Sequence, residues 1–269
     1  MANLNHLRKP LAECKIKIND KNINYIRVGT GDHPVLLLPG ALMSIWLAYK
    51  SQIEGLNADK LTIVAWDPPG YGKSRPPDKT FQDDYRQRDA EYAHTLMKTL
   101  GYSKFSLIGT SDGGVTSLLL ASMYPESIRK MIVVSSKAYM HPDELQTIQR
   151  YRNINLWPEK VKAPLIQFYG EDYFKKMWSL FSDYIQEEYR KHNGDLCKQI
   201  LSKIKCSTLI IHGAKDEITP LECSKYLKQN IANSKLHIFE TGTHNLHLHH
   251  SEKFNNLVTN FLLGPQSKT

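Results

Sequence analysis

The chain has 269 residues, of which 41% are hydrophobic, and this length suits one large or two small domains with a substantial core. Its formal net charge is +8, but the basic residues are spread out and interleaved with acids, so the basic stripe that nucleic-acid binding requires is missing. No run of about 18 apolar residues occurs, so no transmembrane helix is expected.

Short apolar runs bounded by turn residues predict eight β-strands. Two runs alternate, as half-buried antiparallel strands do: ECKIKIN (13–19) and NYIRVG (24–29). Six are nearly continuous, as parallel strands covered on both faces are: PVLLLPG (34–40), LTIVAWD (61–67), FSLIG (105–109), MIVVSS (131–136), STLIIHG (207–213) and KLHIFE (235–240). Helical patterns lie between them over 83–100, 113–124, 221–232 and 252–263. This alternation predicts an α/β fold with a mostly parallel sheet and helices on both faces.

The strand–helix alternation stops between about 139 and 200, where aromatic residues are frequent. Five apolar residues recur there at helical spacing: Phe174, Met177, Trp178, Phe181 and Ile185. We interpret 139–200 as a helical cap over the carboxyl edge of the sheet. The predicted organisation is therefore a core in two parts, 12–138 and 201–264, with the cap inserted between them.

The stretch LIGTSDGG (107–114) places Ser111 between two glycines, after a predicted strand and before a predicted helix. A Gly-x-Ser-x-Gly pattern alone is weak, but this strand–turn–helix setting is the one that a nucleophile elbow needs. Ser111 is therefore the candidate nucleophile. The helix that follows directs its N-terminal N–H groups toward the reacting centre.

An acid and a histidine are expected after the serine, in that order. Asp216 follows a predicted strand in LIIHGAKDEITP (209–220), with Glu217 as the rival acid, and His244 follows the last strand in FETGTHNLHLHH (239–250). We expect His244 to take the Ser111 proton and Asp216 to orient the imidazole. We prefer Asp216 to Glu217 because it sits at the apex of the turn.

The histidines after His244 raise the alternative of a metal site. No carboxylate or cysteine completes a recognisable spacing with them, so no metal is expected. His247, His249 and His250 are instead expected to start a surface helix.

An oxyanion hole needs two backbone donors. One is expected from Asp112, the residue after the nucleophile. The other is expected from Ala41, in the loop after PVLLLPG, where Gly40 lets the chain turn sharply.

Five stretches together resemble one family: LLLPGA (36–41), VAWDPPGYGKSRPPD (64–78), GTSDGG (109–114), LIIHGAKDEITP (209–220) and GTHNLHLHH (242–250). The chain is similar to the valacyclovir hydrolase, or biphenyl hydrolase-like, family of the α/β-hydrolase superfamily, from about residue 12 to 263. One departure is the loop ALMSIWLAYK (41–50), which is bulkier than expected and lacks further glycines.

The resemblance implies a serine esterase that forms an acyl-enzyme and cleaves esters of small α-amino acids, including prodrug esters and homocysteine thiolactone. It implies neither cofactor nor metal, and a small-molecule ester as the binding partner. Ser111, Asp216 and His244 match the family's triad, and Asp112 matches its anchor for the substrate ammonium.

Asp112 needs a physical reason, because a carboxylate about 5–6 Å from a developing oxyanion costs a few kcal/mol at an effective dielectric near 20. A cation must neutralise it. That cation is either a protein lysine or arginine, or the ammonium of the substrate. In the second case neutral esters are rejected, because they leave Asp112 buried and unpaired. We favour the substrate ammonium.

The alternatives are an aminopeptidase-like enzyme, a general esterase, and a weakly catalytic α/β-hydrolase that acts as a small-molecule receptor. The N-terminal segment lacks a secretory apolar region, and four scattered cysteines are typical of a reducing compartment. We expect a cytoplasmic monomer that binds neither nucleic acid nor membrane, with a mitochondrial location as the alternative.

Overall fold

The computed structural model describes residues 11–265, so the expectation about the N-terminal segment lies largely outside the described residues. All eight predicted strands are present in one sheet. They are β1 (Cys14–Ile18), β2 (Lys21–Val28), β3 (His33–Leu38), β4 (Leu61–Trp66), β5 (Phe105–Thr110), β6 (Ile128–Val134), β7 (Ser207–Gly213) and β8 (Ser234–Phe239).

The strands lie in the order β1-β2-β4-β3-β5-β6-β7-β8. The two alternating segments form the antiparallel edge, since β1 pairs with β2, and β2 with β4, in antiparallel fashion. The continuous apolar segments pair in parallel, and β3, β4 and β5 are buried along their whole length. The predicted mostly parallel eight-stranded sheet is confirmed.

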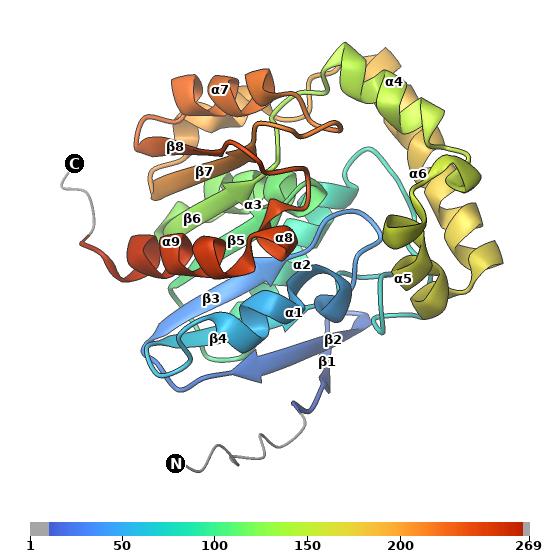
Figure 1. The fold of residues 1–269 in the computed structure, drawn as a ribbon. Coiled ribbons are helices and arrows are strands. Elements are labelled where there is room, and N and C mark those ends of the chain that lie inside the picture. The colour runs from blue at the N-terminus through green and yellow to red at the C-terminus, as the bar shows by residue number, and fades with distance from the viewer. Residues whose placement is uncertain (1–10, 266–269) are drawn as a thin grey trace, which may run out of the picture.

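Helices cover both faces of the sheet (Figure 1). The helices of the core are α1 (Ile45–Gly55), α2 (Tyr85–Thr99), α3 (Asp112–Met123), α7 (Leu221–Asn230), α8 (Leu246–His249) and α9 (Ser251–Leu263), with short 3-10 turns η1 (Pro125–Ser127) and η3 (Lys198–Lys203). Buried residues of α2, α3 and α7 pack on one face, and those of α1, α8 and α9 pack on the other. Helix α1 was not predicted from the sequence.

Between β6 and β7 the chain forms a group of helices, which we call the cap. It contains α4 (Pro142–Arg150), η2 (Ile154–Leu156), α5 (Glu159–Tyr169) and α6 (Glu171–His192). Figure 1 shows these helices grouped to one side of the sheet. The apolar face predicted from Phe174 to Ile185 lies on α6, where Phe174, Met177 and Phe181 are buried.

Parallel strands bring their carboxyl ends to one edge, and the cap lies at that edge. The segments that follow β3, β5, β6, β7 and β8 therefore meet beneath it. None of the helices in residues 11–265 combines the length and apolarity needed to cross a bilayer.

Candidate active site

Ser111 occupies a strained turn between β5 and α3. Its backbone has φ 51° and ψ −118°. This conformation is strained for any residue that carries a side chain, so adopting it costs free energy. The turn is also tight, because a Cβ on Gly113 would lie 2.2 Å from the carbonyl oxygen of Leu38. The Ser111 amide donates to the Val134 carbonyl, and the Ser136 hydroxyl donates to the Ser111 carbonyl at 2.7 Å. Neighbouring strands thus hold the serine at the carboxyl edge of the sheet.

Asp216 and His244 are brought together from the loops after β7 and β8. The Nδ1 atom of His244 lies 3.0 and 2.9 Å from the two carboxylate oxygens of Asp216. Because a carboxylate only accepts, Nδ1 carries the hydrogen, and Nε2 of the neutral ring is left as an acceptor. The backbone amides of Ile218 and Thr219 donate to Oδ1 of Asp216 and hold the carboxylate in place.

Each partner shifts the pKa of the other. Burial disfavours the charge on Asp216, but His244 outweighs it and holds the Asp216 pKa below its usual range. Burial also disfavours the imidazolium, yet the Asp216 charge and hydrogen bond raise the pKa of His244 above its ordinary value. The pair therefore stabilises the protonated ring that a proton transfer from serine would create.

The loop after β3 lies directly against Ser111. A Cβ on Gly40 would lie 3.3 Å from the Cβ of Ser111. Ser44 caps α1, which begins one residue later, and the Tyr49 hydroxyl of α1 lies within hydrogen-bond distance of the carbonyls of Leu38, at 2.7 Å, and Ile108, at 3.1 Å. The bulky sequence after Gly40 is thus a helix start that joins the ends of β3 and β5.

The two residues expected to supply the oxyanion donors, Ala41 and Asp112, both line the cavity that Ser111 lines. Asp112 begins α3, and the first amides of a helix have no acceptor within it.

Asp112 has a cation partner within the protein. Nε of Arg86, on α2, lies 2.7 Å from Oδ1 of Asp112, and the Tyr85 hydroxyl donates to Oδ2 at 2.8 Å. Burial disfavours the carboxylate, but Arg86 outweighs it and lowers the Asp112 pKa. The internal pairing that sequence analysis set against the substrate ammonium is therefore present.

Arg86 also contacts a second acid, which belongs to the cap. Its Nη1 atom lies 2.8 Å from both carboxylate oxygens of Glu188, on α6. The Tyr184 hydroxyl donates to Glu188 at 2.6 Å. The side chains of Arg86, Asp112 and Glu188 are only 6%, 12% and 8% exposed, so these three charges interact largely away from water.

A cavity of about 320 Å³ lies between the sheet edge and the cap. This volume suits a small molecule. Ser111, Asp112 and His244 line it from the core. The cap contributes an apolar wall that includes Trp157, Leu165, Phe174, Trp178, Phe181 and Ile185.

A second charge pair lines the cavity near His244. Lys137, which follows β6, donates to Glu144 on α4, and the Thr219 hydroxyl donates to the same carboxylate oxygen at 3.3 Å. Glu144 raises the pKa of His244 and Lys137 lowers it, after the larger effects of burial and Asp216. The pair links cap to core while contributing no net charge.

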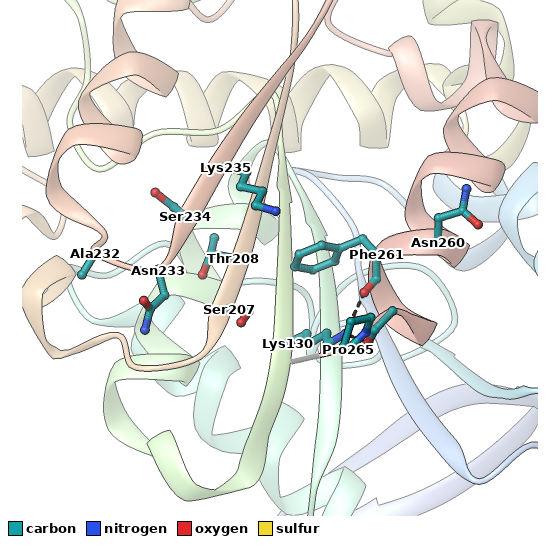
Figure 2. A pocket seen from close by; sticks show the side chains of 11 residues that line it. Lys130, Ser207, Thr208, Ala232, Asn233, Ser234, Lys235, Asn260, Phe261 and Pro265 are labelled. Atoms are coloured by element: carbon teal, nitrogen blue, oxygen red, sulfur yellow. Dashed lines mark hydrogen bonds between the residues drawn. The ribbon is translucent and has the colours of Figure 1, made fainter. Parts of the chain in front are cut away.

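Another cavity, of about 360 Å³, opens at the opposite edge of the sheet, near the amino ends of β6, β7 and β8. Figure 2 shows Lys130 there beside Phe261 and Pro265. Its ammonium donates to the carbonyls of Phe261, Leu262 and Gly264, at the C-terminus of α9. Lys130 thus has a structural role: it caps the C-terminus of α9, where the helix dipole favours a cation.

The prediction that His247 lies on a surface helix is wrong. His247 is 2% exposed, and its Nε2 donates to the Ala48 carbonyl at 3.1 Å. Burial lowers its pKa to about 3. This imidazole therefore joins α8 to α1 as a neutral core residue, while His249 is exposed as expected.

A family model described as alpha/beta hydrolase fold matches residues 33–152. The chain is 41% identical to mouse serine hydrolase BPHL, over 94% of this chain and 87% of the relative. It is 38% identical to human serine hydrolase BPHL with the same coverage.

The chain belongs to the BPHL family of serine hydrolases. The family resemblance and the α/β-hydrolase fold expected from the sequence are therefore confirmed. A meta-cleavage product hydrolase of Pseudomonas fluorescens IP01 (CumD) superposes with a TM-score of 0.77 at 22% identity, covering 93% of this chain and 97% of that one. At this identity the superposition supports the fold alone.

Several charged residues of this site were not predicted from the sequence: Arg86, Lys137, Glu144 and Glu188. A signal for Arg86 did exist. It lies on the face of α2 that also carries Ala90, Ala93 and Met97, all buried, and a charge in an apolar stripe calls for a partner. No local sequence pattern connects Arg86 with Glu188, which lies 102 residues later.

Proposed function

We propose that this protein hydrolyses carboxylic esters of small α-amino acids through an acyl-enzyme on Ser111. The observation that carries the proposal is the position of Asp112. Its carboxylate lines the cavity beside Ser111 and is still 12% exposed. Each of its oxygens accepts one hydrogen bond from the protein, which leaves lone pairs for a substrate ammonium.

The proposed reaction begins with proton transfer from Ser111 Oγ to His244 Nε2 while Oγ attacks the ester carbonyl. The Ala41 and Asp112 amides hold the oxyanion. Collapse expels the alcohol, which takes the proton from His244. Water then attacks the acyl-enzyme with His244 as base, and the amino acid leaves with Ser111 restored.

The apolar cap wall supports an apolar or aromatic acyl side chain. Homocysteine thiolactone also fits the proposal, since it carries an α-ammonium next to an activated acyl carbon. A general esterase is the second candidate, and the Arg86–Asp112 ion pair favours it, because a neutralised Asp112 would not select for a cation.

The deciding experiment compares kcat/KM for the methyl esters of L-phenylalanine and 3-phenylpropanoic acid, which differ only in the amino group. We expect the amino ester to be preferred by at least about a hundredfold, and Asp112→Asn to remove most of that preference. Equal rates on both esters would identify a general esterase.

A fluorophosphonate label separates these enzymes from a receptor with the same fold. An enzyme is labelled rapidly at Ser111, and Ser111→Ala is not labelled. Failure to label, together with no turnover of either ester, would contradict every catalytic proposal.

A further inference from the structure

Arg86 holds a single positive charge against two carboxylates. Asp112 approaches it from the start of α3 and Glu188 from the cap helix α6. The guanidinium can neutralise only one of them, so the cluster retains one negative charge. The Asp112–Arg86 pair alone would be neutral.

Other buried charges nearby do not cancel this remainder. Lys79 pairs with Asp89, and Lys137 pairs with Glu144, so each of these pairs is neutral. Lys160 also lines the cavity, but it is exposed, and water screens its charge.

The three groups of the cluster are held in a fixed arrangement. The Tyr85 ring lies against the guanidinium, with Cζ of Arg86 4.6 Å from the ring centroid. Tyr184 donates to Glu188 and Tyr85 donates to Asp112. Burial disfavours the Arg86 charge, yet Asp112, Tyr85 and Glu188 hold its pKa well above the usual range. Both carboxylates therefore act on the same cation.

We propose that Glu188 sets the selectivity of the site for a substrate ammonium, by occupying Arg86 so that the Asp112 end of the cluster stays negative. Glu188 lies behind Arg86, apart from the described residues that line the cavity, so it acts through Arg86 as a positioning residue. This inference rests on the proposed function. It resolves the objection that the Arg86 ion pair raises against an ammonium site.

The test is Glu188→Gln on the same matched methyl esters. Glutamine keeps the shape and can still accept from Arg86 and Tyr184, but it makes the cluster neutral. We expect the ratio of amino-ester to des-amino-ester kcat/KM to fall at least tenfold. The loss should appear in KM for the amino ester, while kcat/KM for the des-amino ester stays within about threefold or rises.

The matched control is Glu187→Gln, the same chemical change one residue earlier on α6. The Glu187 side chain is 45% exposed and pairs with Arg190, so the ratio should not change. Glu188→Asp keeps the charge and should retain most of the preference. If Glu188→Gln does not fold, Glu188→Asp compared with Glu188→Asn tests the charge at matched size.

A binding measurement removes the chemical step. L-Phenylalaninol carries the ammonium without an ester, and 3-phenylpropan-1-ol is its neutral counterpart. Used as competitive inhibitors of des-amino ester hydrolysis, they should show a Ki ratio that favours phenylalaninol in the wild type and falls at least tenfold in Glu188→Gln.

Three outcomes would overturn the inference. The first is an unchanged ester ratio in Glu188→Gln, and the second is an equal loss on both esters, which indicates a purely structural role. In both of these the wild type still prefers the amino ester and Asp112→Asn loses that preference, so the proposed function survives. The third is a wild type without any preference, which removes the proposed function and the inference together.

Discussion

Arg86 Nε lies 2.7 Å from Oδ1 of Asp112, the residue that directly follows Ser111. A cation thus stands permanently beside the carboxylate that would otherwise oppose an oxyanion at Ser111. The same guanidinium also pairs with Glu188. One positive charge therefore faces two carboxylates, and the cluster keeps a net negative charge.

Loss of Arg86 should cost stability as well as function. In Arg86→Met, Asp112 and Glu188 are left buried without their cation, and we expect the free energy of unfolding to fall by about 3–5 kcal/mol. Urea denaturation at pH 7 measures this change. The added substitution Glu188→Gln should recover part of the loss, because it removes one of the two uncompensated charges.

The control for Arg86→Met is Arg152→Met. Arg152 also pairs with an aspartate, Asp183, but both side chains are about half exposed, at 47% and 52%. Its loss should cost less than about 1 kcal/mol. Similar costs for the two variants would show that burial of the Arg86 cluster is unimportant.

The acid side of the pH–rate profile should report His244. In the proposed mechanism the neutral imidazole of His244 is the base, and Asp216 raises the pKa of His244 above its ordinary value of about 6.5. We therefore expect kcat/KM for a neutral ester to rise with pH through a midpoint above about 6.5. A neutral ester is used so that the substrate does not titrate.

Asp216→Asn removes the charge that stabilises the imidazolium. The acid limb of the residual activity should move to lower pH, and kcat should fall by roughly 10³–10⁴. The control is Glu217→Gln, the exposed neighbour that sequence analysis considered as the rival acid. A profile that shifts in Glu217→Gln and not in Asp216→Asn would reverse the assignment of the acid.

The strained backbone of Ser111 predicts an unusual stability order. Both Ser111→Ala and Ser111→Gly lack the nucleophile and should be inactive. Glycine tolerates φ 51°, whereas alanine does not, so Ser111→Gly should be more stable than Ser111→Ala by about 1 kcal/mol or more. Urea denaturation of the two variants measures the difference, and the reverse order would argue against strain at the elbow.

Local sequence signals were sufficient to predict the sheet and the loops that carry Ser111, Asp216 and His244. Continuous apolar strands, the glycines around Ser111 and the turns that carry Asp216 and His244 are all properties of short segments. The position of the loop at Gly40 and Ala41 beside Ser111 was predicted for the same reason, although α1 was not.

The charge environment could not be predicted in the same way. The cation that meets Asp112 is Arg86 on α2, which lies 26 residues earlier, and the second acid on that cation is Glu188 on α6, which lies 102 residues after Arg86. Arg86 was distinguishable only as a polar residue on a buried helix face. His247 was wrongly placed because its donation to Ala48 spans 199 residues.

The close packing of the elbow gives the last prediction. A Cβ on Gly113 would lie 2.2 Å from the Leu38 carbonyl oxygen and 2.4 Å from that of Pro39, and both belong to backbone that cannot rotate away. Gly113→Ala must therefore separate α3 from the end of β3. We expect a loss of more than about 4 kcal/mol in the free energy of unfolding, or failure to fold. Any folded fraction should have greatly reduced kcat, since Ser111 and the oxyanion loop would move apart.

The control for Gly113→Ala is Gly101→Ala, between α2 and β5. Gly101 has φ +90°, but a Cβ there would meet nothing within 4 Å, so its cost should come from backbone conformation alone, at about 1 kcal/mol. Urea denaturation and kcat on a neutral ester are measured for both variants. A folded, fully active Gly113→Ala would show that β3 and α3 can separate without disturbing Ser111. That result would contradict the idea that the contact between them positions Ser111.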